Sequence, residues 1–109
     1  MGAVSRKLRS TTTGYAHWCP ACNSMHDIKL RGPFVQPPSW SFNQNVEHPT
    51  FDPSINYHHP ASGDVPEFRC HYFLKDGYLH YCPDSTHALR GLTVELPDLP
   101  YYLQIANAT

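Results

Sequence analysis

The sequence predicts a mostly β fold, either a small twisted antiparallel sheet or an open barrel, with at most one short helix. Eleven prolines and six glycines are spread along the 109 residues and interrupt most stretches that could otherwise form a long helix. Seven tyrosines and five phenylalanines favour strands. Because a chain of this length has room for one modest hydrophobic core, we expect a single folded domain.

The first part of the chain divides into an arm and a hairpin. Residues 1–13 are polar and show no hydrophobic periodicity, so we expect a flexible arm there and a single β domain over residues 14–109. Two short strands are expected at residues 15–18 and 25–30. The turn Cys19-Pro20-Ala21-Cys22 joins them, which gives this hairpin the form of a metal-binding knuckle.

The rest of the domain is expected to consist of short extended segments. They are residues 40–43, 49–55, 68–74, 78–82 and 92–96. The third and fourth segments form the strongest strand pair, joined across the three residues Lys75-Asp76-Gly77, whose glycine can adopt a positive φ. Residues 84–91 are expected to form one helical turn that Asp84 or Ser85 caps.

Charge and hydropathy argue against several classes of function. Eight Lys and Arg residues against nine Asp and Glu residues give a formal net charge of −1, which is unlike a protein that binds nucleic acid through phosphate contacts. No window approaches the ~18 apolar residues of a membrane span, and the first residues lack the apolar run of a secretory signal. We therefore expect a cytoplasmic protein, in which disulfides are disfavoured and paired cysteines indicate metal binding.

The four cysteines predict one structural zinc ion, which adds a zinc knuckle to the expected fold. Cys19 and Cys22 supply two thiolates from one tight turn. With a three-residue hairpin loop, Cys70 falls opposite Cys82, and the Cβ atoms of opposed residues lie about 4.5–5.5 Å apart, near enough to share an ion. Cys19, Cys22, Cys70 and Cys82 would then close a tetrahedron around a zinc ion without an open catalytic position.

Other ligand sets are compatible with the same residues. A two-residue hairpin loop would pair Cys82 with His71, which is also a plausible pair of ligands. His26 and His87 are alternative fourth ligands, because each follows a cysteine at short spacing. Without a metal, Cys70 and Cys82 would be small buried residues of the core.

Three further residues have the side chains of a nucleophile, a general base and an orienting carboxylate. Ser54 lies between a proline and an isoleucine in a constrained extended segment, His71 lies in the aromatic hairpin, and Asp84 follows it. Together they would permit hydrolysis if the fold assembles them. The alternative roles are a turn residue for Ser54 and a helix cap for Asp84.

Several motifs together resemble a known family. They are CPAC with His26, WSFN, PTFDPSI, RCHYFLKDG, and DSTHALRG with LPDLP. Across these motifs the chain resembles a family of small phage and prophage proteins, some of which are labelled ammonia-monooxygenase-like. Relatives occur beside bacterial ubiquitin-like conjugation genes, so the resemblance implies a peptidase role in such a system.

The resemblance implies that Ser54, His71 and Asp84 carry out the peptidase reaction. This chain and the family pattern differ at two positions near these residues and the zinc ligands. The family pattern usually has a serine where this chain has Asp52, beside the candidate nucleophile. Some members carry a cysteine at the position of Ser85 rather than of Cys82, which leaves the zinc ligands open. The monooxygenase label has no support here, because soft thiolates are not the ligands of an oxygen-activating copper or iron site.

Two functions compete at this point. The first is a zinc-stabilised serine hydrolase or peptidase that cleaves a flexible protein tail in the host cytoplasm. It requires the Ser54 hydroxyl within hydrogen-bond reach of His71 in a cleft. The second is a non-catalytic phage protein that binds a host factor or decorates the virion, through an exposed apolar patch. The candidates for that patch are Tyr101, Tyr102, Leu103 and Ile105.

Overall fold

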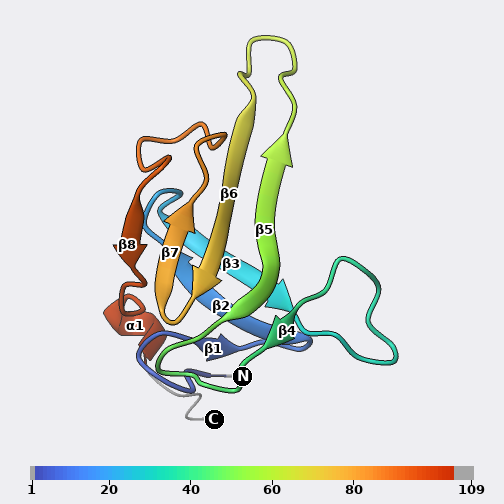
Figure 1. Ribbon diagram of the computed structural model, residues 1–109, viewed down its shortest axis with the longest axis vertical. Coiled ribbons are helices and arrows are strands. Elements are labelled where there is room, and N and C mark those ends of the chain that lie inside the picture. Colours follow the sequence, from blue (N-terminus) through green and yellow to red (C-terminus); the bar gives the residue numbers. More distant parts are fainter. Residues whose placement is uncertain (1, 105–109) are drawn as a thin grey trace.

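The computed structural model describes residues 2–104 and contains two antiparallel sheets (Figure 1). The first has the strand order β1-β2-β3 and the second has the order β4-β5-β6-β7-β8. The predicted mostly β class is confirmed, and the two sheets are not closed into a barrel.

The described part of the chain contains eight strands and one four-residue helix. The first sheet consists of β1 (Arg9–Ser10), β2 (Gly14–Cys19) and β3 (Ser24–Lys29). The second consists of β4 (Ser41–Phe42), β5 (Phe51–His59), β6 (Phe68–Lys75), β7 (Tyr78–Tyr81) and β8 (Thr93–Glu95). The helix α1 is Tyr101–Gln104, and within residues 2–104 no helix has the length and apolar character that crossing a bilayer requires.

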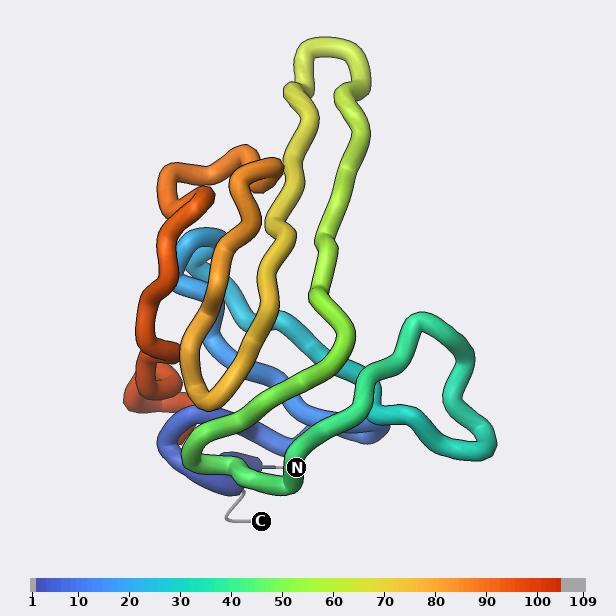
Figure 2. Tube along the Cα trace, in the orientation of Figure 1, coloured from blue at the N-terminus to red at the C-terminus, as the bar shows by residue number. Residues whose placement is uncertain are grey.

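The knuckle hairpin lies where the sequence predicts it, whereas the longest hairpin, between β5 and β6, is not predicted as a pair. β2 and β3 pair from Gly14 opposite Lys29 to Cys19 opposite Ser24, so the knuckle closes their shared end. β5 and β6 form the longer hairpin, whose loop projects from the body of the molecule (Figure 2). The knuckle hairpin therefore belongs to one sheet and the aromatic strands to the other.

The turn between β6 and β7 has two residues, and the predicted three-residue loop is wrong. Lys75 pairs with Tyr78, and Asp76 and Gly77 between them both have positive φ, 51° and 82°. Positive φ at both central residues defines the type I′ turn that fits the twist of a two-residue hairpin. As a result Cys82 lies beside His71, whose carbonyl accepts a 2.8 Å hydrogen bond from the Cys82 N–H, and not opposite Cys70.

The N-terminal segment differs from the flexible arm that the sequence predicts. Leu8 is fully buried, and Arg9 and Ser10 pair with β2. The Lys7 ammonium donates to the Leu96 carbonyl at 2.7 Å, which ties the segment to the opposite end of the chain. The sequence shows no periodicity here because one leucine supplies most of the buried contact.

The helical turn that the sequence predicts at residues 84–91 is also absent from the structure, where this segment forms turns. The Ser85 hydroxyl hydrogen-bonds to the His71 backbone on the edge of β6, and Thr86 hydrogen-bonds to the Arg69 backbone through both its N–H and its hydroxyl. Because their hydroxyls compete for backbone partners, such residues favour extended or turn conformations over helix. This segment extends the second sheet beyond the end of β7.

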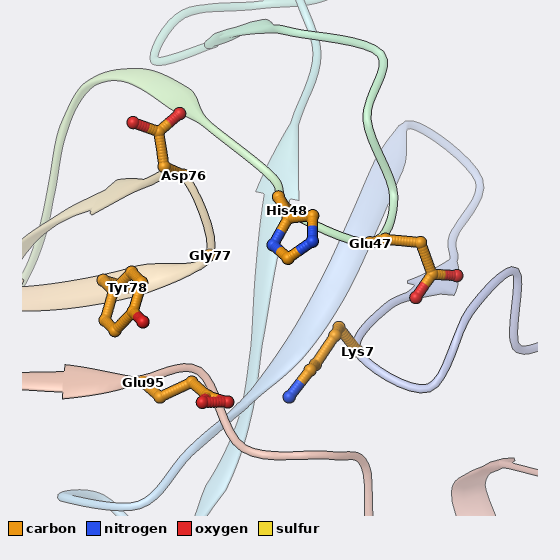
Figure 3. A pocket seen from close by; sticks show the side chains of 7 residues that line it. All are labelled: Lys7, Glu47, His48, Asp76, Gly77, Tyr78 and Glu95. Atoms are coloured by element: carbon orange, nitrogen blue, oxygen red, sulfur yellow. The ribbon is translucent and has the colours of Figure 1, made fainter.

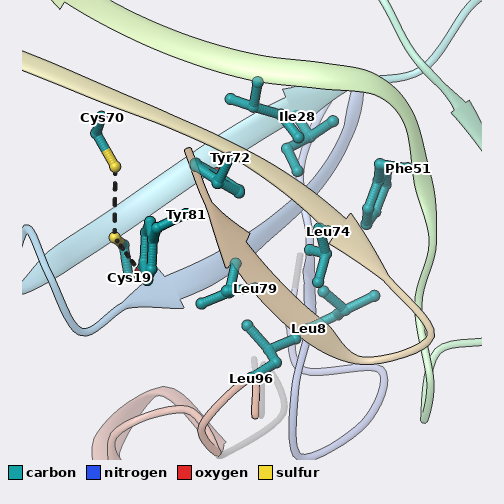
Figure 4. Close-up of a cluster of buried hydrophobic side chains, with 11 residues drawn as sticks. Leu8, Cys19, Ile28, Phe51, Cys70, Tyr72, Leu74, Leu79, Tyr81 and Leu96 are labelled. Atoms are coloured by element: carbon teal, nitrogen blue, oxygen red, sulfur yellow. Dashed lines mark hydrogen bonds between the residues drawn. The ribbon is translucent and has the colours of Figure 1, made fainter. Parts of the chain in front are cut away.

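The core lies between the two sheets (Figure 4). Its buried side chains come from both sheets, from the N-terminal segment and from the residue after β8, and they are Leu8, Cys19, Ile28, Phe51, Ile55, Cys70, Tyr72, Leu74, Leu79, Tyr81 and Leu96. On β6 the residues alternate: Cys70, Tyr72 and Leu74 are buried against the core, whereas His71 and Phe73 are more exposed. Since successive side chains of a strand point to opposite faces, β6 presents one set of residues to the core and another to the outer face.

Candidate active site and metal centre

The structure brings together the three residues that the sequence predicts as a catalytic set. The Nε2 atom of His71 lies 3.1 Å from the Ser54 hydroxyl oxygen. Its Nδ1 atom lies 3.0 and 3.2 Å from the two carboxylate oxygens of Asp84. The three side chains thus form one continuous chain of hydrogen bonds.

Strand register explains how Ser54 meets His71. Asn56 on β5 is paired with His71 on β6, and Ser54 lies two residues earlier on β5. Residues two apart share a face of a sheet, so Ser54 is a diagonal neighbour of His71 on the outer face. The β5–β6 register shifts between Phe51 and Ile55, and this irregularity places Ser54 at the point where the ladder is interrupted.

Trp40 fixes the backbone of the candidate nucleophile. Its indole N–H donates to the Ser54 carbonyl at 3.1 Å. Its own backbone N–H donates to the Lys29 carbonyl at 2.8 Å, and its carbonyl accepts from Arg31 at 2.9 Å. Ser54 is therefore tied to the end of β3. The sequence indicates Trp40 only as a strand residue and carries no signal for this contact.

Asp84 is positioned by the two residues that follow it. The Ser85 hydroxyl donates to the His71 carbonyl and accepts from the His71 N–H, both at 3.0 Å. Thr86 makes the equivalent pair of contacts with Arg69. These bonds hold the segment against β6, so that Asp84 reaches the His71 ring while its side chain remains 53% exposed.

The proton arrangement of this chain suits a nucleophile and its base. A carboxylate only accepts, so the His71 Nδ1–H must donate to Asp84, and in a neutral imidazole Nε2 then carries the lone pair. Nε2 then accepts from the Ser54 hydroxyl. This tautomer is the one in which a histidine can take a proton from serine.

A second group of residues lies on the buried side of β6 and could hold a metal ion. Its members are Cys19, Cys22, His26 and Cys70, whose ligand atoms all lie within 4.8 Å of one another. The sulfurs of Cys19 and Cys70 are 3.9 Å apart, and a dashed line marks this contact in Figure 4. Two sulfurs of a tetrahedral zinc site with Zn–S bonds of about 2.3 Å would be separated by about 3.8 Å.

The predicted ligand Cys82 does not belong to this group, and this corrects the expected ligand set. Because the hairpin turn has two residues, Cys82 lies beside His71 and Asp84 on the other side of the sheet. His26, one of the alternatives from the sequence, takes its place in the cluster. His87, the other alternative, packs edge-on against Tyr81 with 4.7 Å between ring centroids.

Hydrogen bonds set the tautomer of His26. The Nδ1–H of His17 donates to the Trp18 carbonyl at 3.1 Å, so His17 Nε2 accepts the 2.6 Å bond from the Tyr72 hydroxyl. The Tyr72 oxygen then accepts from His26 Nδ1 at 3.0 Å. His26 Nε2 consequently keeps its lone pair, which a metal ligand needs, while its Nδ1–H is held by a buried partner.

The charges of the cluster also suit a cation. A hydrogen bond from the Cys70 thiol lowers the pKa of Cys19 to about 5, and donating that bond raises the pKa of Cys70. Burial, with the negative charge on Cys19, raises the pKa of Cys22 to about 11. Burial lowers the pKa of His26 to about 3, so this imidazole is neutral. The cluster alone carries one thiolate readily, and further thiolates require a bound cation.

A pocket of about 160 Å³ lies at the β6–β7 turn, and Figure 3 shows the side chains around it. It is lined by Lys7, Glu47, His48, Asp76, Gly77, Tyr78 and Glu95. None of the candidate catalytic or metal-binding residues lines it. Ser54 and His71 instead lie half-buried on the outer face of the second sheet.

Residues near the C-terminus include part of the apolar patch that the binding hypothesis requires. Tyr101 and Tyr102 are 80% and 68% exposed, whereas Leu103 is half-buried. Ile105 lies outside the described residues. Of the two features that the hydrolase hypothesis requires, the Ser54–His71 hydrogen bond is present, whereas the pocket at the β6–β7 turn includes neither residue.

Comparison with protein families supports one part of the resemblance seen in the motifs, the link to bacterial ubiquitin-like conjugation systems. Residues 2–82 match the family described as "Bacterial ubiquitination-like system serine protease (BubE)". The match contains Ser54, His71 and the Cys19 knuckle, and Asp84 follows it by two residues. Comparisons with curated proteins and with solved structures give no significant match. Since the family match spans well over half of the chain, the protein belongs to the family of bacterial ubiquitination-like system serine proteases.

Proposed function

We propose that the protein is a serine peptidase of a bacterial ubiquitination-like system, with Ser54 as nucleophile, His71 as general base and Asp84 as the carboxylate that orients it. The observation that carries the proposal is the continuous hydrogen-bonded chain from the Ser54 hydroxyl through both ring nitrogens of His71 to Asp84. The family match supports the same reaction class.

Each step of peptide hydrolysis has a residue to perform it. The Ser54 oxygen attacks the carbonyl carbon of the substrate while His71 Nε2 takes its proton. The resulting imidazolium, stabilised by Asp84, gives that proton to the leaving amine as the C–N bond breaks. Water then attacks the acyl carbon while His71 Nε2 takes its proton. The bond between that carbon and the Ser54 oxygen breaks, His71 returns the proton to Ser54, and the new carboxyl group is released.

We propose a flexible, extended protein tail as the substrate, and the open edge of β5 supports this. His71 and Arg69 use their backbone groups for hydrogen bonds with the chain that follows β7. In an antiparallel ladder their β5 partners, Asn56 and His58, must then direct N–H and C=O groups away from β6.

This edge continues the strand that carries the nucleophile. β4 pairs with β5 only at Phe51 and Asp52, so within residues 2–104 no strand pairs with the outer edge of Asn56 and His58. An extended tail could add there as a further strand through main-chain hydrogen bonds. A tail bound in this way would pass directly beside Ser54.

We also propose that Cys19, Cys22, His26 and Cys70 hold one structural zinc ion. Three thiolates and one imidazole form a closed tetrahedral set, which leaves no position for a substrate or a water molecule. The metal would join the knuckle of the first sheet to β6 of the second. It would stabilise the fold, and the reaction would depend on Ser54, His71 and Asp84.

Cleavage of a tailed substrate tests the proposed function. The substrate is a ubiquitin-like protein from a bacterial ubiquitination-like system with a flexible C-terminal extension, and mass spectrometry follows the removal of the extension. We expect cleavage by the wild type and by Ser62→Ala, which changes an exposed loop serine, and none by Ser54→Ala. Equal cleavage by Ser54→Ala and wild type would contradict the assignment of the nucleophile.

A further inference from the structure

A second set of metal-binding side chains lies within the candidate active site itself. His71, Cys82 and Asp84 each offer a ligand atom, and these atoms lie within 4.8 Å of one another. The hydrogen bond from the Cys82 N–H to the His71 carbonyl makes these two residues cross-strand neighbours on the outer face. This set, called the His71 set, shares no residue with the Cys19 cluster, which consists of Cys19, Cys22, His26 and Cys70.

We propose that a zinc ion binds His71, Cys82 and Asp84 reversibly and switches off the peptidase. The inhibitory consequence rests on the proposed function, whereas the binding site rests only on the geometry of the three side chains. A nitrogen, a sulfur and an oxygen ligand are all donors that zinc accepts.

Metal binding at this position would remove the base from the reaction. Asp84 contacts His71 at Nδ1, so Nδ1 is the ring nitrogen that can share an ion with that carboxylate. Forming the Zn–N bond displaces the Nδ1 proton, which moves through solvent to Nε2, and forming the Zn–S bond releases the Cys82 thiol proton to the buffer. An imidazole that is protonated at Nε2 cannot accept the Ser54 proton.

The two metal sites should differ strongly in affinity. The Cys19 cluster supplies four ligands, two of them fully buried, and closes around the ion. The His71 set supplies three ligands, of which Asp84 is 53% exposed, and leaves a fourth position to water. Zinc should therefore fill the structural site first and occupy the inhibitory site only when in excess.

Cobalt absorption on the full chain tests the site independently of activity. We expect the first equivalent of Co²⁺ to give the charge-transfer absorption of a three-thiolate site and the second to add the smaller absorption of one thiolate. Cys82→Ala should keep the first signal and lose the second. An unchanged second signal in Cys82→Ala, or no second signal in the wild type, would overturn the proposed site.

Reaction with a fluorophosphonate probe tests the inhibition. In the wild type, zinc beyond one equivalent should slow labelling of Ser54 by about tenfold or more, and a chelator added at low concentration should restore it. Labelling of Cys82→Ala, measured against its own rate without added zinc, should not respond. Zinc that fills the site without slowing the wild type would overturn the switch. Absence of labelling in zinc-limited wild type would instead contradict the proposed function.

Discussion

His71 depends on three contacts that come from different parts of the chain. Ser54 reaches its Nε2 from β5, Asp84 reaches its Nδ1 from the segment after β7, and Ser85 holds its backbone. Asp84 is more exposed than the other two members of the hydrogen-bonded chain. Its main contribution should therefore be to select the tautomer and orientation of the imidazole.

Replacing Asp84 by asparagine should slow the reaction of Ser54 while leaving the fold intact. An amide can donate to Nδ1, which would favour the tautomer with a proton on Nε2 and remove the base. We expect the rate constant for fluorophosphonate labelling to fall on the order of 10²–10⁴-fold. Asp64→Asn, in the exposed loop between β5 and β6, is the matched control and should react like the wild type. Equal rates for the two variants would exclude the role of Asp84.

Tyr72→Phe tests the hydrogen bonds that set the tautomer of His26. Loss of the hydroxyl leaves a nitrogen of His17 and one of His26 without their buried partner. We expect zinc affinity to fall about 10–100-fold, measured by competition with a chelator. Tyr57→Phe is the matched control. Tyr57 also packs on the His26 ring, but its hydroxyl donates to the Asp27 carbonyl and not to a histidine. An equal loss in both variants would show that the Tyr72 hydroxyl does not set the ligand.

At the scale of elements, β6 connects the two groups of functional residues. Its inward residue Cys70 belongs to the candidate metal cluster and its inward residue Tyr72 hydrogen-bonds to His26, whereas its outward residue His71 belongs to the candidate active site. A shift of register by one residue would exchange the two faces. The β6–β7 turn, which sets that register on one side, should therefore influence both groups.

Gly77→Val should damage the β6–β7 hairpin. Gly77 has a φ of 82°, where a β-branched residue is strained, although a Cβ there would meet only ordinary contacts, the nearest at 3.4 Å from His48. We expect a loss of about 1–2 kcal/mol in the free energy of unfolding, measured by urea denaturation. Asp76→Asn, which keeps a residue that tolerates positive φ, should lose far less. The turn assignment fails if the two variants are equally stable.

Several elements could be predicted from the sequence because their signals are local. Aromatic residues and the glycine turn between the two segments indicate β6 and β7, and the knuckle indicates the β2–β3 hairpin. The turn length could not be predicted, since Lys75-Asp76-Gly77 fits a three-residue loop and Asp76-Gly77 fits a two-residue one. The length of this turn determines which residue lies opposite Cys82, and therefore whether Cys82 can belong to the candidate metal cluster.

The candidate active site was predicted by residue type and not by spacing. Ser54, His71 and Asp84 could be named because their side chains have the required chemistry, but such a set is easily found in a chain with eight histidines. Contacts through Trp40 and Ser85 depend on which strands become neighbours, which no local pattern encodes. Likewise, the burial of Leu8 arises from packing between distant segments.

At the scale of the molecule, the proposed zinc ion would join two sheets that otherwise share one modest core. Cys19, Cys22 and His26 belong to the first sheet and its knuckle, whereas Cys70 belongs to the second. Small domains often rely on such a metal because their cores bury little apolar surface.

Phage origin and association with a virion stay predictions from the sequence.

Removal of the metal should therefore destabilise the whole domain. We expect a strong chelator to lower the melting temperature sharply, since the free energy of metal binding contributes to folding. His26→Ala and Cys22→Ala should lose the tight zinc ion, whereas Cys82→Ala should retain it, as measured by metal content after gel filtration. Retention of zinc by His26→Ala together with its loss from Cys82→Ala would restore the ligand set first predicted from the sequence.

The central claim, that Ser54 is a nucleophile activated by His71, is tested most directly by mapping where a fluorophosphonate probe reacts on the folded chain. We expect a single adduct, located by peptide mass spectrometry on Ser54, which forms at least on the order of 100-fold more slowly in His71→Ala. The exposed serine Ser62 should remain unmodified in both proteins. A wild-type chain that gives no adduct, or one whose adduct lies on another serine or forms at the same rate without His71, would contradict the account.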